Sequence, residues 1–445
     1  MHVVMKELVK PSHFVSQIDH MHQKLVLRGR LFEESENDVL FYHISLMRKQ
    51  FATLLARSIK QETFFFGLGL ESSLMIKNKP QTVIHHSITD RIVEGVLTRI
   101  LSSHANSVFS DSLCSYRSGM SVNTAIQCAA QFITSHRTAQ QKKQVNLYGL
   151  KTDIAGYCNT IPVHSTSPIW GKLRALLRSI DREHEVGDYL WRLIERVVVP
   201  HYLTEEGEVA VNDKGLSFGS SIACLIYNYY VCQMDFDVHA IPGLFYIRYC
   251  DDILLMHEDK DCVNQAYALI RDVLQKDQLD LSKEKTKLFY LTVPGKPCED
   301  HNFIGCNSVS FLGTSIQATG NVRLLSHHTR EFLKQVRHRI DVVCQQTRHL
   351  SFDERGFLLC RAVRHAIHPG STFAVGKLTK LFDLHNERQQ LRQLDWQIAQ
   401  WVVQALTGTS GRAGFSQASY RQLRHQWGLP SLVNLRNKVR EIAVK

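Results

Sequence analysis

The sequence predicts an α+β fold followed by an all-helical C-terminal region, and three observations support this prediction. The 445 residues, 44% of them apolar, are enough for a core of two or three subdomains. The period of the apolar residues changes from helical to strand-like near residue 146 and is helical throughout beyond about residue 326. The net charge of +11 lies in residues 321–445, which carry 20 Lys and Arg against 8 Asp and Glu.

The first part of the chain is expected to be mainly helical. Leu40, Ile44, Met47 and Phe51 recur at three- and four-residue spacings, which predicts one amphipathic helix across residues 40–59. A second helical pattern over residues 88–100 leads into a loop rich in Ser and Gly, and a further helix is expected over 122–134. We therefore expect residues 1–75 to form a helical extension.

Short strands are predicted around two acidic sites. The segment VNLYGLKTDI at residues 145–154 is rich in β-formers and ends by presenting Asp153. The segment LFYIRYCDDILLM at residues 244–256 is expected to form two strands, with Asp251 and Asp252 at the reversal. An aspartate pair between apolar flanks is costly to desolvate unless a positive charge compensates it.

The remaining pattern alternates helices and hairpins. Helices are expected over 169–199, 220–235 and 261–275, and hairpins around residues 205–208 and 311–325. The helices beyond residue 326 carry basic residues outside their apolar stripes. Such a basic block is typical of a surface that faces a polyanion, with nucleic acid as the first candidate. A solvated helical surface is the alternative, and composition does not decide between them.

The aspartates at the predicted strand ends suggest metal-dependent chemistry. If the two strands are neighbours, Asp153, Asp251 and Asp252 can converge on two divalent cations. Hard carboxylate ligands favour Mg²⁺ over zinc, and Mn²⁺ can substitute for Mg²⁺. One cation would lower the pKa of an attacking hydroxyl, while the other would steady a triphosphate and the departing pyrophosphate. The pattern therefore predicts phosphoryl or nucleotidyl transfer.

These segments resemble reverse transcriptases. Tyr249 to Asp252 is similar to the Tyr-x-Asp-Asp box of that family, and TDIAGYCNTI at residues 152–161 resembles its first catalytic strand. The segment KGLSFGSSIACLIYN at residues 214–228 resembles the glycine loop and helix that lie against template and incoming nucleotide. The resemblance implies that Gly219 and Asn228 take part there.

Further blocks follow the family order. LSKEKTKL resembles the motif that contributes a lysine near the pyrophosphate, here Lys285, and Phe311, Leu312 and Gly313 resemble the primer grip. Two blocks resemble the fingers of the group II intron and related bacterial branch, and they carry Arg91 and Arg117 as candidate phosphate ligands. Each of these residues also has a structural alternative. Lys285 could belong to a solvated lysine face, Phe311 and Leu312 could pack in the core, and the two arginines could form salt bridges.

Some positions depart from the family. Ser217 and Phe218 stand where the family usually has Pro-Gln before the loop glycine, a place where the template would be contacted. Where reverse transcriptases usually place a large side chain that excludes the ribose 2′-hydroxyl, this chain has Cys158, with Tyr157 just before it. Either Tyr157 takes that role or sugar discrimination is relaxed, and we prefer the first alternative.

The resemblance implies a right-hand polymerase with an antiparallel catalytic sheet. Its parts would be an N-terminal helical extension of the fingers at 1–75, fingers and palm at 76–320, and a basic α-helical thumb at 321–445. It implies an RNA-directed DNA polymerase that uses two Mg²⁺ ions, dNTPs, a DNA primer and an RNA template. No segment is apolar enough to suggest a membrane span, and eleven cysteines without a C-x-x-C spacing favour a reducing cytoplasm.

The compact chain with its helical tail is similar to bacterial defence-associated reverse transcriptases, type 2 being the nearest type. This implies a cognate structured noncoding RNA as template and a role in antiphage defence. Three alternatives stay open: an RNA-directed RNA polymerase, a group II intron-type maturase that only binds RNA, and a protein-primed or template-independent DNA polymerase. Oligomeric state is not predictable from the sequence.

Overall fold

The computed structural model describes residues 1–27, 40–76, 79–139, 146–216, 219–292, 302–367 and 388–436. Its contacts divide the chain into two units. Unit 1 comprises Met1–Gly119, Thr152–Ile253 and Asp261–Thr286, and unit 2 comprises Met120–Lys151, Leu254–Lys260 and Lys287–Lys445. Each unit is therefore built from segments that are distant in the sequence.

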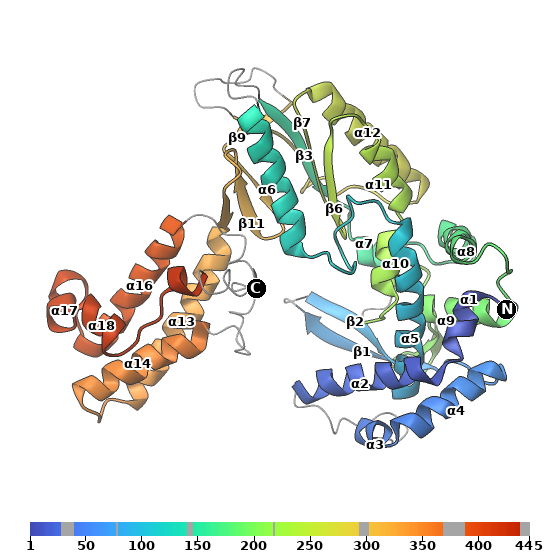
Figure 1. The fold of residues 1–445 in the computed structure, drawn as a ribbon, viewed down its shortest axis with the longest axis horizontal. Helices are drawn as coiled ribbons and strands as arrows, with labels where there is room; N and C mark the ends of the chain where they lie inside the picture. Colours follow the sequence, from blue (N-terminus) through green and yellow to red (C-terminus); the bar gives the residue numbers. More distant parts are fainter. Residues whose placement is uncertain are drawn as a thin grey trace. The chain divides into compact units, whose positions relative to one another are not determined.

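Unit 1 begins with helices, as predicted, which are coloured blue in Figure 1. The expected single helix over residues 40–59 is wrong in one respect, because Met47 leaves helical geometry (φ −101°, ψ 25°) and separates two helices. The next helix buries Ile92, Val93 and Val96 almost completely, which explains its apolar stripe. The helices of this region are α1 (Val3–Leu8), α2 (Pro11–Leu27), α3 (Phe41–Leu46), α4 (Arg48–Lys60), α5 (Ile88–Ala105) and the 3₁₀ turn η1 (Asn106–Val108).

A four-stranded sheet follows the N-terminal helices, and two of its strands, β1 (Gly69–Ile76) and β2 (Lys79–His85), were not predicted from the sequence. These two strands form an antiparallel hairpin. Strand β1 also pairs in parallel with β4 (Tyr202–Leu203), which pairs with β5 (Val209–Ala210) in the predicted hairpin. The strand order β2-β1-β4-β5 places Pro80 on an edge strand, where its missing N–H is tolerated.

The strands that carry the predicted aspartates belong to a five-stranded sheet of order β6-β7-β3-β8-β9. β3 pairs antiparallel with β8, and β8 pairs in parallel with β9. The boundary between the units crosses β3 and β7, so the strand ends with the aspartates lie in unit 1. The sheet confirms the strands expected at 145–154 and 244–256. Its strands are β6 (Phe245–Tyr249), β7 (Asp252–His257), β3 (Leu147–Asp153), β8 (Lys287–Leu291) and β9 (Ile304–Cys306).

The other helices of unit 1 follow the predicted pattern with one correction. Helix α8 begins as its sequence indicates, because the Ser167 side chain accepts the N–H of Ile169 and Pro168 occupies the first turn. The single helix expected over 220–235 is wrong, since Val231 (φ −113°, ψ 19°) divides it. The helices are α7 (Tyr157–Thr160), α8 (Pro168–Ile180), α9 (Asp188–Val198), α10 (Ala223–Tyr229), α11 (Cys232–His239) and α12 (Lys260–Lys276).

Unit 2 contains α6 (Val122–Ala139), a three-stranded sheet and the C-terminal helices, the last of these drawn in orange and red in Figure 1. The sheet confirms the hairpin predicted around residues 311–325 and consists of β10 (Ser308–Phe311), β11 (Thr314–Gln317) and β12 (Val322–Leu324). The helices are α13 (Ser326–Gln346), α14 (Phe352–Ile367), α16 (Arg388–Thr407), α17 (Gly411–Gln417) and α18 (Tyr420–His425).

The C-terminal helices share one apolar core. Phe332, Val336 and Ile340 of α13 pack in a cluster that also contains Leu391 and Ile398 of α16. These residues lie at the helical spacings that predicted the two faces, because burial of one stripe is what stabilises an amphipathic helix. In the described part of the chain, none of the helices combines the length and apolarity that a membrane crossing requires. The three-part division at residues 75 and 320 stays a prediction.

Candidate active site

The structure brings the Asp153 and Asp251 segments together. Strand β3 lies beside β7 in the sheet, and the Ile154 N–H donates a hydrogen bond of 3.1 Å to the carbonyl oxygen of Asp251. Asp153 is 3% exposed, while Asp251 and Asp252 are half-buried. Two segments 98 residues apart therefore meet at the point where the sequence predicts catalytic carboxylates.

The electrostatics of this point favour a cation. The ammonium of Lys285 donates to one carboxylate oxygen of Asp153, and the other oxygen is buried without a hydrogen-bond partner among the described residues. Burial raises the pKa of Asp251, and the negative charge of Asp153 raises it further, while Lys285 opposes the rise. Positive charge placed here would compensate two carboxylates that burial and mutual repulsion penalise.

The side chains near Asp153 have the right chemistry for divalent cations, but they are not arranged as a metal site in this structure. Among the described residues, no group of three or more His, Cys, Asp or Glu side chains is arranged so that it could hold a metal ion. The unpartnered buried oxygen of Asp153 and the all-carboxylate donor set nevertheless suit hard cations such as Mg²⁺. Lys285, which is exposed, supplies the positive charge next to Asp153 in this conformation.

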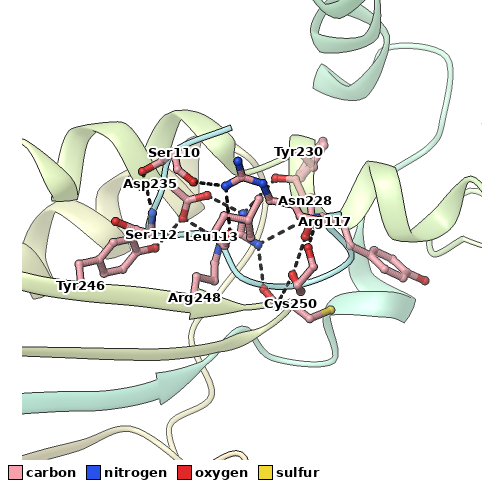
Figure 2. A network of polar contacts seen from close by, with 12 residues as sticks. Ser110, Ser112, Leu113, Arg117, Asn228, Tyr230, Asp235, Tyr246, Arg248 and Cys250 are labelled. Carbon is pink, nitrogen blue, oxygen red and sulfur yellow. Dashed lines mark hydrogen bonds and ion pairs between the residues drawn. The ribbon is translucent and has the colours of Figure 1, made fainter. Parts of the chain in front are cut away.

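The backbone of Cys250, immediately before Asp251, is held by two hydrogen bonds, and Figure 2 shows Cys250 next to Arg248. Cys250 has φ of +60°, a left-handed conformation that is unfavourable for a residue with a side chain. Its N–H donates to the Ser115 hydroxyl at 2.9 Å, and its carbonyl accepts from the Arg248 guanidinium at 2.9 Å. These contacts fix the backbone immediately before Asp251.

A buried ion pair anchors Arg248, and the sequence analysis did not identify it. Arg248 and Asp235 have no exposed side-chain surface and form two hydrogen bonds, of 2.8 and 2.6 Å. The Tyr246 hydroxyl also donates to Asp235, at 2.7 Å. The signal in the sequence was an arginine inside the apolar strand FYIRY, where an unpaired charge would be very costly. The pair joins β6 to α11.

The side chain of Asn228, a predicted substrate contact, is hydrogen-bonded to Ser115 in this structure. It is 1% exposed, its side-chain oxygen accepts from the Ser115 hydroxyl at 2.7 Å, and its amide donates to the Ser115 carbonyl at 2.6 Å. Both ends of the side chain are therefore used to hold the loop that contacts Cys250. Asn228 supports the aspartate turn indirectly in this conformation.

The two arginines with predicted phosphate roles differ in their surroundings. The Arg117 guanidinium donates to the carbonyls of Ser110 at 2.6 Å and Leu113 at 3.1 Å, and it lies 5.8 Å from the centre of the Phe109 ring. Arg117 therefore holds its own loop together. Its alternative role was a salt bridge, and none is found for it among the described residues. Arg91 is exposed on α5.

The structure favours Cys158 over Tyr157 at the position of sugar discrimination. Tyr157 is 1% exposed, and its hydroxyl donates to the Tyr227 carbonyl at 2.7 Å, so its ring belongs to the core. Cys158 is only half-buried. A hydrogen bond with the Cys250 thiol lowers the pKa of Cys158 to about 7 against the effect of burial, so the Cys158 thiol lies beside the turn that carries Asp251.

The glycine loop is joined to this same region. The Gly215 N–H donates to the Ile161 carbonyl at 2.8 Å, and the Leu216 N–H donates to the Cys158 carbonyl at 3.1 Å. Gly219 has φ of +97° with open space around its α-carbon, a conformation that glycine adopts readily. Ser217 and Phe218, which replace the usual residues of the family, lie outside the described residues.

A buried glutamate that the sequence analysis did not single out holds the end of the glycine loop. Glu94 of α5 accepts hydrogen bonds from the Ser220 hydroxyl at 2.7 Å and the Ser221 N–H at 2.6 Å. It thereby satisfies backbone donors before α10, as a capping residue does. The sequence signal was a glutamate among the apolar residues of IVEGVL.

The predicted primer grip is a tight turn in unit 2. Phe311 pairs with Thr314 across a two-residue turn in which Leu312 and Gly313 have φ of +46° and +81°. Phe311 is buried, as the core-packing alternative expects, whereas Leu312 and Gly313 are half-buried. A primer-gripping role of this turn stays a prediction.

Comparison with known proteins identifies the family. Residues 76–316 match the family described as reverse transcriptase (RNA-dependent DNA polymerase). None of the curated proteins matches the chain in sequence.

Solved telomerase structures are similar to the chain at low identity. The apo telomerase of Candida tropicalis truncated from its C-terminal domain is 14% identical, with 58% of this chain and 55% of that chain covered and a TM-score of 0.42. The Candida albicans telomerase in complex with the TWJ fragment of telomeric RNA is 11% identical, with coverages of 83% and 65% and a TM-score of 0.43. A second apo telomerase structure from Candida tropicalis is 11% identical, with coverages of 81% and 69% and a TM-score of 0.45.

The chain thus spans little more than half the length of the first of these structures. The family match, in contrast, covers more than half of the chain's 445 residues and includes all three predicted catalytic aspartates. Together with the mixed α+β architecture, it confirms the predicted right-hand polymerase fold. The chain belongs to the reverse transcriptase family, whose members are RNA-dependent DNA polymerases.

Proposed function

We propose that this chain copies RNA into DNA by extending a primer 3′-hydroxyl with dNTPs, and that Asp153, Asp251 and Asp252 hold two Mg²⁺ ions for this reaction. The observation that carries the proposal is the hydrogen bond between the Ile154 N–H and the Asp251 carbonyl, which joins the two carboxylate-bearing segments. The raised pKa of Asp251, to which the charge of Asp153 contributes, supports the same assignment.

The side chains around the aspartates have separable tasks in this proposal. When bound, a pair of divalent cations supplies charge neutralisation at the triphosphate and a lowered pKa of the attacking hydroxyl. Lys285 stays protonated because its hydrogen bond with Asp153 raises its pKa, so it can give a proton to the leaving pyrophosphate. Cys158 borders the sugar, whereas Tyr157 positions the α7 turn from within the core.

The template and the biological role form the finer part of the proposal. We infer that the template is a cognate structured noncoding RNA and that the chain acts in the cytoplasm of a bacterium in antiphage defence. Support comes from the resemblance of the compact chain to the defence-associated class and from the excess of basic residues in 321–445, which suits a folded polyanion.

Primer extension tests the proposal. Purified protein with Mg²⁺, dNTPs, a DNA primer and an RNA template should make DNA, and Asp251→Ala combined with Asp252→Ala should abolish synthesis while RNA affinity persists. The matched control is Asp272→Ala, an exposed aspartate on α12, which should leave the rate unchanged. Normal dNTP incorporation by the double variant would show that the site assignment is wrong, and a chain that binds RNA without DNA synthesis would favour the maturase alternative.

A further inference from the structure

Unit 1 contains a second hollow that none of the predicted site residues lines. It measures about 750 Å³, within the range of small-molecule pockets, and is formed by α8, α9 and the segment before β1. We call it the aromatic–arginine pocket after the lining residues used below: Phe65, Trp170, Arg174, Trp191, Arg192 and Arg196.

The aromatic part of the pocket is packed together and partly exposed. The rings of Trp170 and Trp191 meet edge to face with their centres 6.0 Å apart, and the Trp170 indole N–H donates to the His164 carbonyl at 2.9 Å. The Arg174 guanidinium lies 3.9 Å from the centre of the Trp191 ring. Phe65 is 63% exposed at the same hollow. Packed rings and a stacked guanidinium plane form the kind of surface on which nucleobases stack.

Arginines outnumber carboxylates among the residues that line the pocket. The described lining holds Arg174, Arg192 and Arg196 and the carboxylate of Glu195, while the charge of Asp90 acts on Arg196 from outside this lining. One guanidinium nitrogen of Arg196 is buried and has no hydrogen-bond partner among the described residues. An unpartnered buried donor is costly, which is why such a group commonly marks the place of a missing acceptor. The pocket therefore combines stacking surface with donors that suit phosphate.

We propose that the aromatic–arginine pocket binds a nucleotide unit, with its base against the aromatic and guanidinium planes and its phosphate at Arg196. A ligand must match both the aromatic surface and the arginine donors of the pocket. An apolar ligand would leave the arginines unpaired, and an inorganic anion would leave the rings exposed. The inference goes beyond the copying reaction, since it assigns a nucleotide site apart from the three aspartates.

The nucleotide unit has two sources that share this chemistry. It is either a free nucleotide or one nucleotide of a single-stranded RNA or DNA. The first source would make the pocket a small-molecule site, and the second would make it an anchor for a strand.

Equilibrium dialysis of the full chain with AMP, in EDTA to suppress metal-dependent binding, tests the proposal. Arg174→Gln and Arg196→Gln should each weaken AMP binding by about tenfold, because each removes a charged donor or stacking plane. The matched control is Arg178→Gln on the same helix α8 but outside the pocket lining. Adenosine and inorganic phosphate should each bind more weakly than AMP, and Asp251→Ala with Asp252→Ala should leave AMP binding unchanged.

A second arm distinguishes the two sources. If a fluorescein-labelled ten-nucleotide poly(rA) binds the unaltered chain more tightly than AMP does and loses affinity in Arg174→Gln and Arg196→Gln, the nucleotide belongs to a strand. Equal affinities of the pocket variants, the control and the unaltered chain for both probes would overturn the proposal. A chain that sediments as a dimer and becomes monomeric in Arg174→Gln would assign the pocket to a second copy and overturn it as well. Arg174 is exposed, so this variant keeps the test valid if Arg196→Gln fails to fold.

Discussion

At the scale of single residues, the candidate site is built from groups that oppose stability. Asp251 ionises less readily in the folded protein than in the unfolded chain, because burial and the charge of Asp153 raise its pKa. Folding with this carboxylate charged therefore carries a cost, which fades as pH falls through the raised pKa and is absent only below the pKa of the unfolded chain. Functional sites commonly retain such costs because the charge is needed for chemistry.

Asp251→Asn should therefore stabilise the metal-free protein at pH 7 while reducing primer extension to background. The gain should shrink as pH approaches 3, where the native carboxyl is also neutral. Urea unfolding at the two pH values measures this, with Asp272→Asn on the exposed face of α12 as the control. A variant that is less stable than the native chain at pH 7 would mean that neighbouring groups already offset the cost of burying the Asp251 charge.

The position of Cys158 leads to a prediction about sugar selectivity. A cysteine leaves more room beside a ribose than a large side chain does, so the native enzyme should accept rNTPs to a measurable extent. Cys158→Phe should raise the preference for dNTPs over rNTPs by about tenfold or more, as a clash with one added group can do. The ratio of kcat/KM for the two substrates measures it, with Cys262→Phe as a control on α12. An unchanged ratio would mean that another residue discriminates between dNTPs and rNTPs.

Sequence patterns could predict the places of Asp153 and Asp251 because Asp153 ends a strand and Asp251 lies between two strands, all of them rich in β-formers. They could not place the ring of Tyr157, because the four residues of α7 are too short to show a period. Whether that ring faces substrate or core depends on α10, whose Tyr227 carbonyl accepts its hydroxyl. The same limit applies to Asn228, whose hydrogen bonds with Ser115 no sequence pattern shows and whose contact with substrate stays a prediction.

At the scale of elements, the aspartate turn depends on the attachment of β6 to α11. Arg248 connects the buried Asp235 carboxylate to the Cys250 carbonyl, so a change on α11 reaches the residue before Asp251. The desolvation cost of such a buried ion pair offsets much of its attraction, so we expect its net contribution to stability to be small.

Asp235→Ala should lower the free energy of unfolding by about 3 kcal/mol or more, since it leaves Arg248 charged and buried. Combining Asp235→Leu with Arg248→Met should recover part of that stability, because no unpaired charge remains. Primer extension should stay impaired in the double variant, since the Cys250 carbonyl has lost its donor. Urea unfolding and extension rates measure both effects, and a single variant that loses less than about 1 kcal/mol would contradict the account.

The sequence predicted most elements of this fold, and its failures have local causes. The β1–β2 hairpin was missed because GLESSLMI lacks strict alternation and Pro80 interrupts the second strand, while pairing with distant β4 supplies the missing information. The division between α10 and α11 was missed because neither Gly nor Pro occurs between Tyr229 and Cys232. Both features are set by tertiary contacts that no local pattern encodes.

At the scale of the whole molecule, the charge is segregated along the chain. Residues 321–445 carry the entire positive excess, and exposed basic side chains of this region include Lys334, Arg339 and Arg348. Arg337 differs from them because it pairs with Asp341 at 3.1 Å and lies 5.5 Å from the centre of the Trp401 ring. The exposed residues are therefore the ones to test for contacts with nucleic acid.

Neutralising Lys334, Arg339 and Arg348 to Gln should flatten the salt dependence of RNA binding. If each contacts a phosphate, the slope of log affinity against log salt should fall in magnitude by about 2. A matched triple variant of exposed basic residues in unit 1, with Gln at positions Lys24, Arg57 and Lys60, should leave the slope unchanged. Equal slopes for the native chain and the first triple variant would mean that the basic block only solubilises the helices.

The whole account depends on Asp153 and Asp251 acting together on divalent cations. Electron paramagnetic resonance of Mn²⁺ titrated into the protein with primer, template and a dNTP measures this most directly. We predict two bound Mn²⁺ ions per chain, with loss of bound metal in both Asp153→Asn and Asp251→Asn and no loss in the Asp272→Asn control. Unchanged Mn²⁺ stoichiometry and affinity in the first two variants would contradict the claim that these strands form a metal-dependent polymerase site.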